Sequence, residues 1–204
     1  ELTEGIGTTG VRPGIIKCGT GHGSMSEYEG KVFAAVARAS VVTGAPVTTH
    51  TDDGTVGDLQ QQVLTRGNVP SNRIIIGHSC GTTDTDYHMT IASGGSYLGF
   101  DRFGIAALMS DEDRADSLMR LITQGAGDRI VVSHDSVWCW KGEPFPTYAM
   151  DRLSEVMEPT RFDREIIPML KDRGATEEQI EMLVVDNPRR FFSGESLKSL
   201  NPTS

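Results

Sequence analysis

The sequence predicts an α/β fold of the (β/α)₈-barrel kind, and three observations carry that prediction. Five short β-branched runs alternate with helical patterns along the 204 residues. The runs are almost continuously apolar, as is typical of parallel strands buried on both faces. Each run also ends at or near an ionisable side chain. The alternation alone is compatible with an open doubly wound sheet or a closed barrel, because right-handed βαβ units build both.

The first unit combines a strand over residues 14–17 with a helix that starts after Ser26. Glu29 stands three residues beyond Ser26, as in a capping box, and Gly44 is a typical residue for the helix end. Four further strands are predicted over residues 46–50, 74–78, 97–102 and 129–135. The later helices are predicted to end at Gly67, to cover 84–92, to run from a cap at Ser110 to Gly125, and to cover 162–173 and 176–185.

Composition places the chain among ordinary globular proteins, with 37% hydrophobic and 23% charged residues. A net charge of −9 disfavours nonspecific binding to nucleic acid and to anionic membranes. No apolar run approaches the ~20 residues that span a bilayer. Three cysteines without a C-x-x-C pair suit reduced thiols. We therefore expect a cytoplasmic protein with neither a nucleic-acid nor a membrane partner.

Ionisable residues lie at or near the carboxyl end of each predicted strand: Lys17, His50, His78, Arg102 and Asp135. In a barrel these ends share one rim, where active sites are built, whereas in an open sheet they form a line. Five successive strands that end this way favour the barrel. Two imidazoles and a carboxylate suit Zn²⁺, Mn²⁺ or Co²⁺, and a carboxylate beside an activated water can accept its proton.

Lys17 requires a separate explanation, because an ammonium group would repel metal ions. A lysine buried at a strand end tends to become a neutral amine. A neutral amine reacts with carbon dioxide to give a carbamate, an anion whose two oxygens can bridge two metals. We therefore expect Lys17 to be buried and to serve as a ligand.

Each of these residues also has a structural explanation, as a hydrogen-bonded core histidine, a salt-bridge lysine or a loop-capping aspartate. The joint pattern favours the metal site. We interpret His22 and His88 as surface residues and His134 as structural, because His134 points to the strand face opposite Asp135. The loop over residues 19–23 has the spacing G-x-G-x-G, and no acidic residue ends the second strand, so a nucleotide site remains a weaker alternative.

Residues 14–17, 47–50, 76–78 and 132–135 resemble the ligand segments of the phosphotriesterase family of the amidohydrolase superfamily, and residues 187–192 resemble its C-terminal helix. The resemblance implies a distorted (β/α)₈ barrel that binds two divalent ions, zinc foremost, with manganese, cobalt or iron as alternatives. A carbamate on Lys17 would bridge the ions. His50 and His78 would bind one ion, and Asp135 would bind the other and accept a proton. The resemblance also implies a homodimer.

Residues 97–104 look like the lactonase branch of that family, in which an arginine occupies the position of Arg102. This likeness implies that a hydroxide between the metals attacks a lactone carbonyl, with side activity on organophosphate triesters. Arg102 would then contact the substrate and take part in catalysis. One position departs from the branch, which usually carries aspartate where this chain has Gly81. Candidates to line a hydrophobic substrate pocket are Trp138, Trp140 and Phe145.

The family's first strand supplies a His-x-His pair, and no such pair occurs here. A barrel needs eight βα units and about 250 residues, whereas five units are recognisable. We therefore expect residues 1–204 to form the C-terminal part of one barrel, strands four to eight, with strands one to three absent and the metal site incomplete. Another ester or amide is the alternative substrate, and a non-catalytic α/β fragment or nucleotide-binding module is the alternative class.

Overall fold

Five parallel strands form the centre of the computed structural model, which describes residues 1–136, 142 and 158–200. The strands are β1 (Ile16–Lys17), β2 (Val47–Thr48), β3 (Ile74–Ile76), β4 (Tyr97–Phe100) and β5 (Ile130–Val132). Their spatial order follows the chain, and every neighbouring pair is parallel. The predicted parallel α/β fold is confirmed. A doubly wound sheet reverses its strand order at a switch point, so the sequential order favours a barrel wall.

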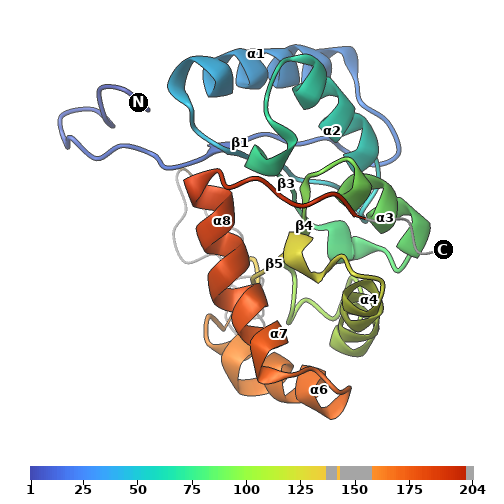
Figure 1. The fold of residues 1–204 in the computed structure, drawn as a ribbon. Coiled ribbons are helices and arrows are strands. Elements are labelled where there is room, and N and C mark those ends of the chain that lie inside the picture. Colours follow the sequence, from blue (N-terminus) through green and yellow to red (C-terminus); the bar gives the residue numbers. More distant parts are fainter. Residues whose placement is uncertain (137–141, 143–157, 201–204) are drawn as a thin grey trace.

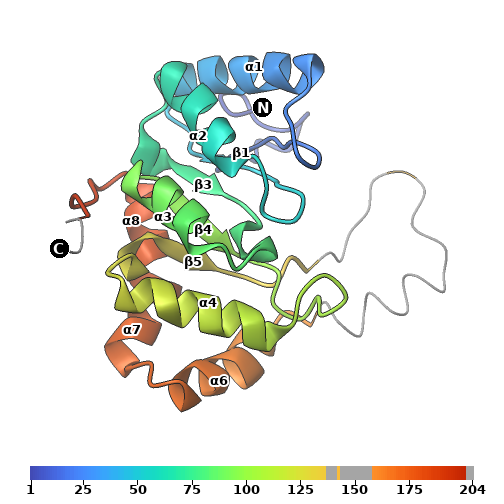
Figure 2. The same cartoon turned by 90° about the vertical axis from the view of Figure 1, so that its right-hand side faces the viewer.

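Four helices connect successive strands: α1 (Glu27–Thr43), α2 (Gly57–Arg66), α3 (Thr85–Ser93) and α4 (Asp111–Thr123). Figure 1 shows them following one another around the outer side of the sheet, and Figure 2 shows them stacked in chain order beside the strands. Right-handed crossovers in one direction place every helix on the same face of a sheet. The opposite face, which would be the barrel interior, is therefore left for the strand-end side chains.

The helix boundaries follow the capping residues that the sequence indicates. Ser26 Oγ accepts a hydrogen bond from the Glu29 backbone, and the Glu29 carboxylate accepts one from Ser26 N, which completes the predicted capping box. Gly44 ends α1 in the left-handed conformation, with φ 73°. Asp84 and Ser110 cap α3 and α4 through their side chains. These short-range predictions are confirmed.

The predicted end of the last helix near residue 185 is wrong, because the helical path continues to Ser193, whereas the C-terminal helix that the resemblance indicates over residues 187–192 is confirmed. Here α7 (Glu177–Glu181) passes through the π-helical η5 (Met182–Asp186) into α8 (Asn187–Ser193). Pro188 lies in the first turn after the π-helical segment, where the hydrogen-bonding pattern changes and its missing N–H costs little. The preceding helical pair is η4 (Phe162–Ile166) and α6 (Ile167–Asp172).

Residues far apart in sequence hold α8 against the sheet. Asn187 is fully buried, and its Nδ2 donates to Gly127 O at 2.8 Å and to Ile130 O at 2.7 Å. Phe191 is also fully buried and meets the Tyr97 ring edge-on, with centroids 5.5 Å apart. The last helix is thereby fixed beside β4 and β5. None of the described helices is long and apolar enough to cross a membrane.

His88 corrects a prediction, because it is fully buried rather than exposed. It shares the inner face of α3 with Ile91 and Ala92, at the i, i+3, i+4 spacing of one helix side. Its Nε2 donates to Ser79 O at 2.8 Å. Burial lowers the pKa of the His88 imidazole below its ordinary value. His88 is therefore a neutral core residue that ties α3 to the chain after β3.

Candidate metal centre

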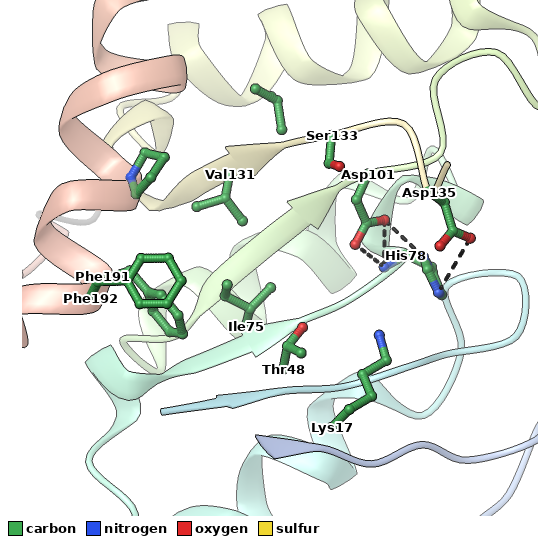
Figure 3. A pocket seen from close by; sticks show the side chains of 12 residues that line it. Lys17, Thr48, Ile75, His78, Asp101, Val131, Ser133, Asp135, Phe191 and Phe192 are labelled. Carbon is green, nitrogen blue, oxygen red and sulfur yellow. Dashed lines mark hydrogen bonds and ion pairs between the residues drawn. The ribbon is translucent and has the colours of Figure 1, made fainter. Parts of the chain in front are cut away.

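The carboxyl ends of β1, β2, β3 and β5 bring the four predicted ligands to one edge of the sheet. Figure 3 shows Lys17, His78 and Asp135 around one pocket of about 370 Å³. The rings of His50 and His78 meet edge-on, with centroids 4.6 Å apart. His78 Nε2 lies 4.0 Å from Asp135 Oδ2. Side chains from four strands thus converge on the space that parallel topology makes available.

The backbone is strained at two of these residues. His78 has φ 58° and Asp135 has φ 51°, both in the left-handed region that non-glycine residues rarely adopt. Each such residue costs of order 1–3 kcal/mol, and such residues concentrate at functional sites. In both cases the turn follows directly on a strand end. Both residues with a strained backbone, His78 and Asp135, therefore have side chains that line the pocket.

His78 is fixed by a carboxylate that sequence reasoning missed. Asp101 Oδ1 lies 2.9 Å from both the backbone nitrogen and the ring Nδ1 of His78. Such a pairing is common behind histidines that bind metals through the other ring nitrogen. The signal for Asp101 was available, because it ends β4 beside the more conspicuous Arg102, in the strand adjacent to that of His78.

The donor atoms fit a divalent ion. The 4.0 Å between His78 Nε2 and Asp135 Oδ2 is too long for a hydrogen bond. Nitrogen and carboxylate oxygen are the ligand types that zinc accepts. Both side chains therefore offer donor atoms of the kind that divalent ions accept, on the same side of the pocket.

His50 is paired differently, through Asp52, which sequence reasoning also missed. His50 Nε2 lies 2.8 Å from Asp52 Oδ1, so the nitrogen left for another ligand is Nδ1. Burial lowers the pKa of the His50 imidazole. A Cβ at Gly19 would lie 2.8 Å from His50 Cβ, so the first glycine of the glycine-rich loop makes room for this histidine.

The remaining loop glycines do not form a phosphate cradle. Thr20 N donates to His50 O, Gly21 N donates to the Glu29 carboxylate at 2.8 Å, and Gly23 N donates to Thr55 Oγ1. A phosphate-binding loop needs free amide groups and tolerates no carboxylate among them. These bonds count against the nucleotide-binding alternative.

Lys17 is exposed, which corrects the expectation that it is buried. Its Nζ donates to Thr49 O at 2.6 Å and faces the pocket. Within the described part of the chain β1 is an edge strand paired only with β2, so no second strand lies on its outer side. Burial of Lys17 would require a further strand beside β1.

Arg102 and Asp135 contact each other, since Arg102 Nε donates to Asp135 Oδ2 at 3.3 Å. The guanidinium is mostly buried, with 14% exposure, whereas the carboxylate keeps 36%. Over residues 1–136, 142 and 158–200, no three His, Cys, Asp or Glu side chains group as a metal site. All four predicted ligands bond to protein partners instead: Lys17 to Thr49, His50 to Asp52, His78 to Asp101 and Asp135 to Arg102.

Three further predictions concern histidines and aromatic residues near the rim. His22 is exposed, as predicted, with its ring 3.5 Å from Asp53. His134 donates through Nε2 to Pro159 O and does not join the other histidines. The substrate-pocket candidates Trp138, Trp140 and Phe145 lie outside the described residues.

Gly81 departs from the lactonase pattern for a packing reason. A Cβ at this position would lie 2.6 Å from Gly54 N and 2.8 Å from the Asp53 carbonyl carbon. Both contacts are with backbone, which cannot rotate away. The loop after β2 therefore occupies the space that an aspartate side chain would need.

Parallel strands in sequential order, with lysine, histidine and carboxylate groups around one pocket at their carboxyl ends, define the wall of an α/β barrel with a candidate metal centre on its rim. The chain belongs to the phosphotriesterase family, whose model matches residues 1–192. It is 35% identical over 193 residues to the phosphotriesterase homology protein of Mycobacterium tuberculosis, covering 94% of this chain and 59% of that protein.

Two other relatives carry more specific names. The aryldialkylphosphatase of Saccharolobus solfataricus is 33% identical over 198 residues, covering 95% of this chain and 62% of that protein. A mutant PTE-like lactonase from Deinococcus radiodurans superposes with a TM-score of 0.84 at 38% identity, covering 94% of this chain and 61% of its own. The chain therefore spans about three fifths of the length of these relatives and matches a corresponding part of a barrel.

Proposed function

We propose that this chain is the C-terminal part, strands four to eight, of a binuclear metal-dependent lactonase with side activity on organophosphate triesters. One observation carries the proposal: His78 is held at its strand end with Nε2 facing Asp135, and Lys17 lines the same pocket. The lactonase and aryldialkylphosphatase names of two relatives support the substrate class. By the same resemblance the complete enzyme forms a homodimer.

The ligands in this proposal are Lys17, His50, His78 and Asp135. The Lys17 ammonium group would first lose a proton, and the resulting amine would add carbon dioxide and lose a second proton. A cation that repels metal ions would thereby be replaced by a carbamate anion that could hold them. Bound divalent ions, zinc foremost, would polarise the carbonyl and activate water at neutral pH. Because Arg102 Nε holds Asp135 Oδ2, the carboxylate has a fixed orientation from which to accept the proton of the attacking water.

Arg102 is proposed to contact the substrate as well. Its guanidinium stands beside Asp135 at the rim, where a carbonyl or phosphoryl oxygen would gain negative charge during the reaction. The proposed apolar lining comprises Trp138, Trp140 and Phe145. Their aromatic rings would bury the hydrophobic part of a lactone.

The experiment uses the protein extended by the coding sequence upstream of Glu1, loaded with zinc or cobalt. We expect that extension to contain a His-x-His pair. We expect hydrolysis of an acyl-homoserine lactone and weaker hydrolysis of an aryl dialkyl phosphate triester. His50→Ala and Asp135→Asn should each lower kcat/KM by more than about a hundredfold, since outer-shell changes alone cost 10–100-fold. His22→Ala is the matched control, because His22 is an exposed histidine.

Two results would overturn parts of this proposal. Hydrolysis that survives exhaustive chelation would exclude the metal mechanism. Activity confined to another ester or an amide would exclude the lactone assignment and keep the metal site. For the unextended 204-residue protein we expect an incomplete site, so a zinc titration that shows two tightly bound ions per chain would contradict the assignment to strands four to eight.

A further inference from the structure

Asp101 occupies a slot that two glycines create between neighbouring strands. A Cβ at Gly99 would lie 2.6 Å from Asp101 Oδ2 and 3.0 Å from Gly77 Cα. A Cβ at Gly77 would lie 2.1 Å from Thr49 O and 3.4 Å from the same carboxylate oxygen. Side chains at either position would therefore displace the carboxylate or the strands. Glycine at both positions lets Asp101 reach back to the start of the turn at His78 (Figure 3).

The hydrogen bonds of this carboxylate determine which nitrogen of His78 carries the proton. Asp101 Oδ1 lies 2.9 Å from His78 Nδ1, and Asp101 Oδ1 and Oδ2 lie 2.9 Å and 3.2 Å from His78 N. An ionised carboxylate only accepts hydrogen bonds, so Nδ1 must donate. In the neutral ring Nε2 is then unprotonated. The His78 side chain is 4% exposed, so water competes little for either nitrogen.

We propose that Asp101 is the positioning residue of this site, which holds His78 in the Nδ1–H tautomer and directs the unprotonated Nε2 into the pocket toward Asp135. The double contact fixes the backbone turn and the ring together, because one carboxylate binds His78 N and Nδ1 at once. The purpose of the tautomer, presenting a lone pair to a metal ion, rests on the proposed function. The tautomer itself does not.

The second histidine of the site offers a contrast within the same structure. Asp52 binds His50 through Nε2 rather than Nδ1, and its side chain is 45% exposed, against 17% for Asp101. The backbone nitrogen of His50 donates to Cys18 O, not to Asp52. The Asp52 contact therefore fixes its histidine less tightly than the Asp101 contact does. Asp52→Asn serves as a matched control, because it changes a carboxylate beside a site histidine and leaves the contacts between Asp101 and His78 in place.

The test measures ring nitrogen shifts in the ¹⁵N-labelled 204-residue protein at alkaline pH, with His78 assigned through His78→Gln. We expect a protonated Nδ1 and an unprotonated Nε2 in His78. Asp101→Asn preserves shape but replaces a charged acceptor with a neutral one, so the tautomer ratio should move about tenfold toward Nε2–H, or about 1.4 kcal/mol. Asp52→Asn should leave His78 in the Nδ1–H tautomer.

Gly99→Ala provides a second variant, because it displaces the carboxylate without removing it and should shift the tautomer in the same direction as Asp101→Asn. An Nε2–H tautomer in the unmodified protein, or an unchanged ratio in Asp101→Asn, would overturn the proposal. In the extended protein Asp101→Asn should weaken zinc binding 10–100-fold. Unchanged zinc affinity would overturn the positioning role, whereas a protein that binds no zinc would overturn the proposed function and leave the tautomer result standing.

Discussion

Placing an aspartate at position 81, as the resembled lactonases usually have, should destabilise this protein. In Gly81→Asp the new Cβ begins 2.6 Å from Gly54 N, whereas ordinary contact starts at 3.4 Å. The loop after β2 and the turn after β3 must therefore separate by about 0.8 Å, the difference between these two distances. Overpacking of this kind costs about 1–3 kcal/mol.

The measurement is urea denaturation of Gly81→Ala and Gly81→Asp beside the unmodified protein. A loss of 1–3 kcal/mol corresponds to roughly 2–12 °C in Tm for a chain of this size. Gly14→Ala is the matched control, because a Cβ there meets nothing within 4 Å, and it should stay within about 0.5 kcal/mol. If Gly81→Ala is as stable as the control, the loop yields at no cost and packing does not explain the missing aspartate.

Two further predictions concern buried side chains outside the pocket. Asn187→Ala should cost about 1–3 kcal/mol in urea denaturation, because it removes two buried hydrogen bonds, to Gly127 O and to Ile130 O. A loss below about 0.5 kcal/mol would contradict this role. Burial lowers the pKa of His88 in the folded state, so below about pH 6.5 the unfolded chain binds the proton more readily than the folded protein does. The free energy of unfolding should therefore fall as the pH is lowered below about 6.5, by up to about 1.4 kcal/mol per pH unit. His88→Gln keeps a donor for Ser79 O but cannot titrate, so its free energy of unfolding should depend less on pH in this range. Equal pH dependence in both proteins would refute the assignment of this effect to His88.

The starts and ends of helices could be predicted from the sequence where a residue type has one well-defined structural role. The Ser26–Glu29 capping box and the left-handed Gly44 define α1 without reference to the rest of the chain. The helix after residue 185 was not readable in this way. Its continuation depends on Asn187 reaching carbonyl groups nearly 60 residues earlier, and no local pattern carries that information.

The candidate site likewise has parts that the sequence predicts and parts that depend on the tertiary structure. Ligand-type residues at strand ends could be recognised in the sequence, because parallel strands bring their carboxyl ends to one rim. Which ligand each partner binds could not be predicted, because the pairing of Asp101 with His78 depends on the register of β3 and β4 and on Gly77 and Gly99. His88 shows the opposite error, since a polar residue in a helix is assigned to the surface until the neighbouring elements bury it.

The sequence by itself determined the alternation of strands and helices, the resemblance to one family and the residue types at the rim, because these depend on local chemistry and on order along the chain. Only the tertiary structure decided that Lys17 is exposed at an edge strand, that the loop after β2 excludes a side chain at Gly81, and that Asp101 sets the orientation of His78. Each of these depends on distances between segments that are remote in sequence, and such distances exist only once the strands have paired.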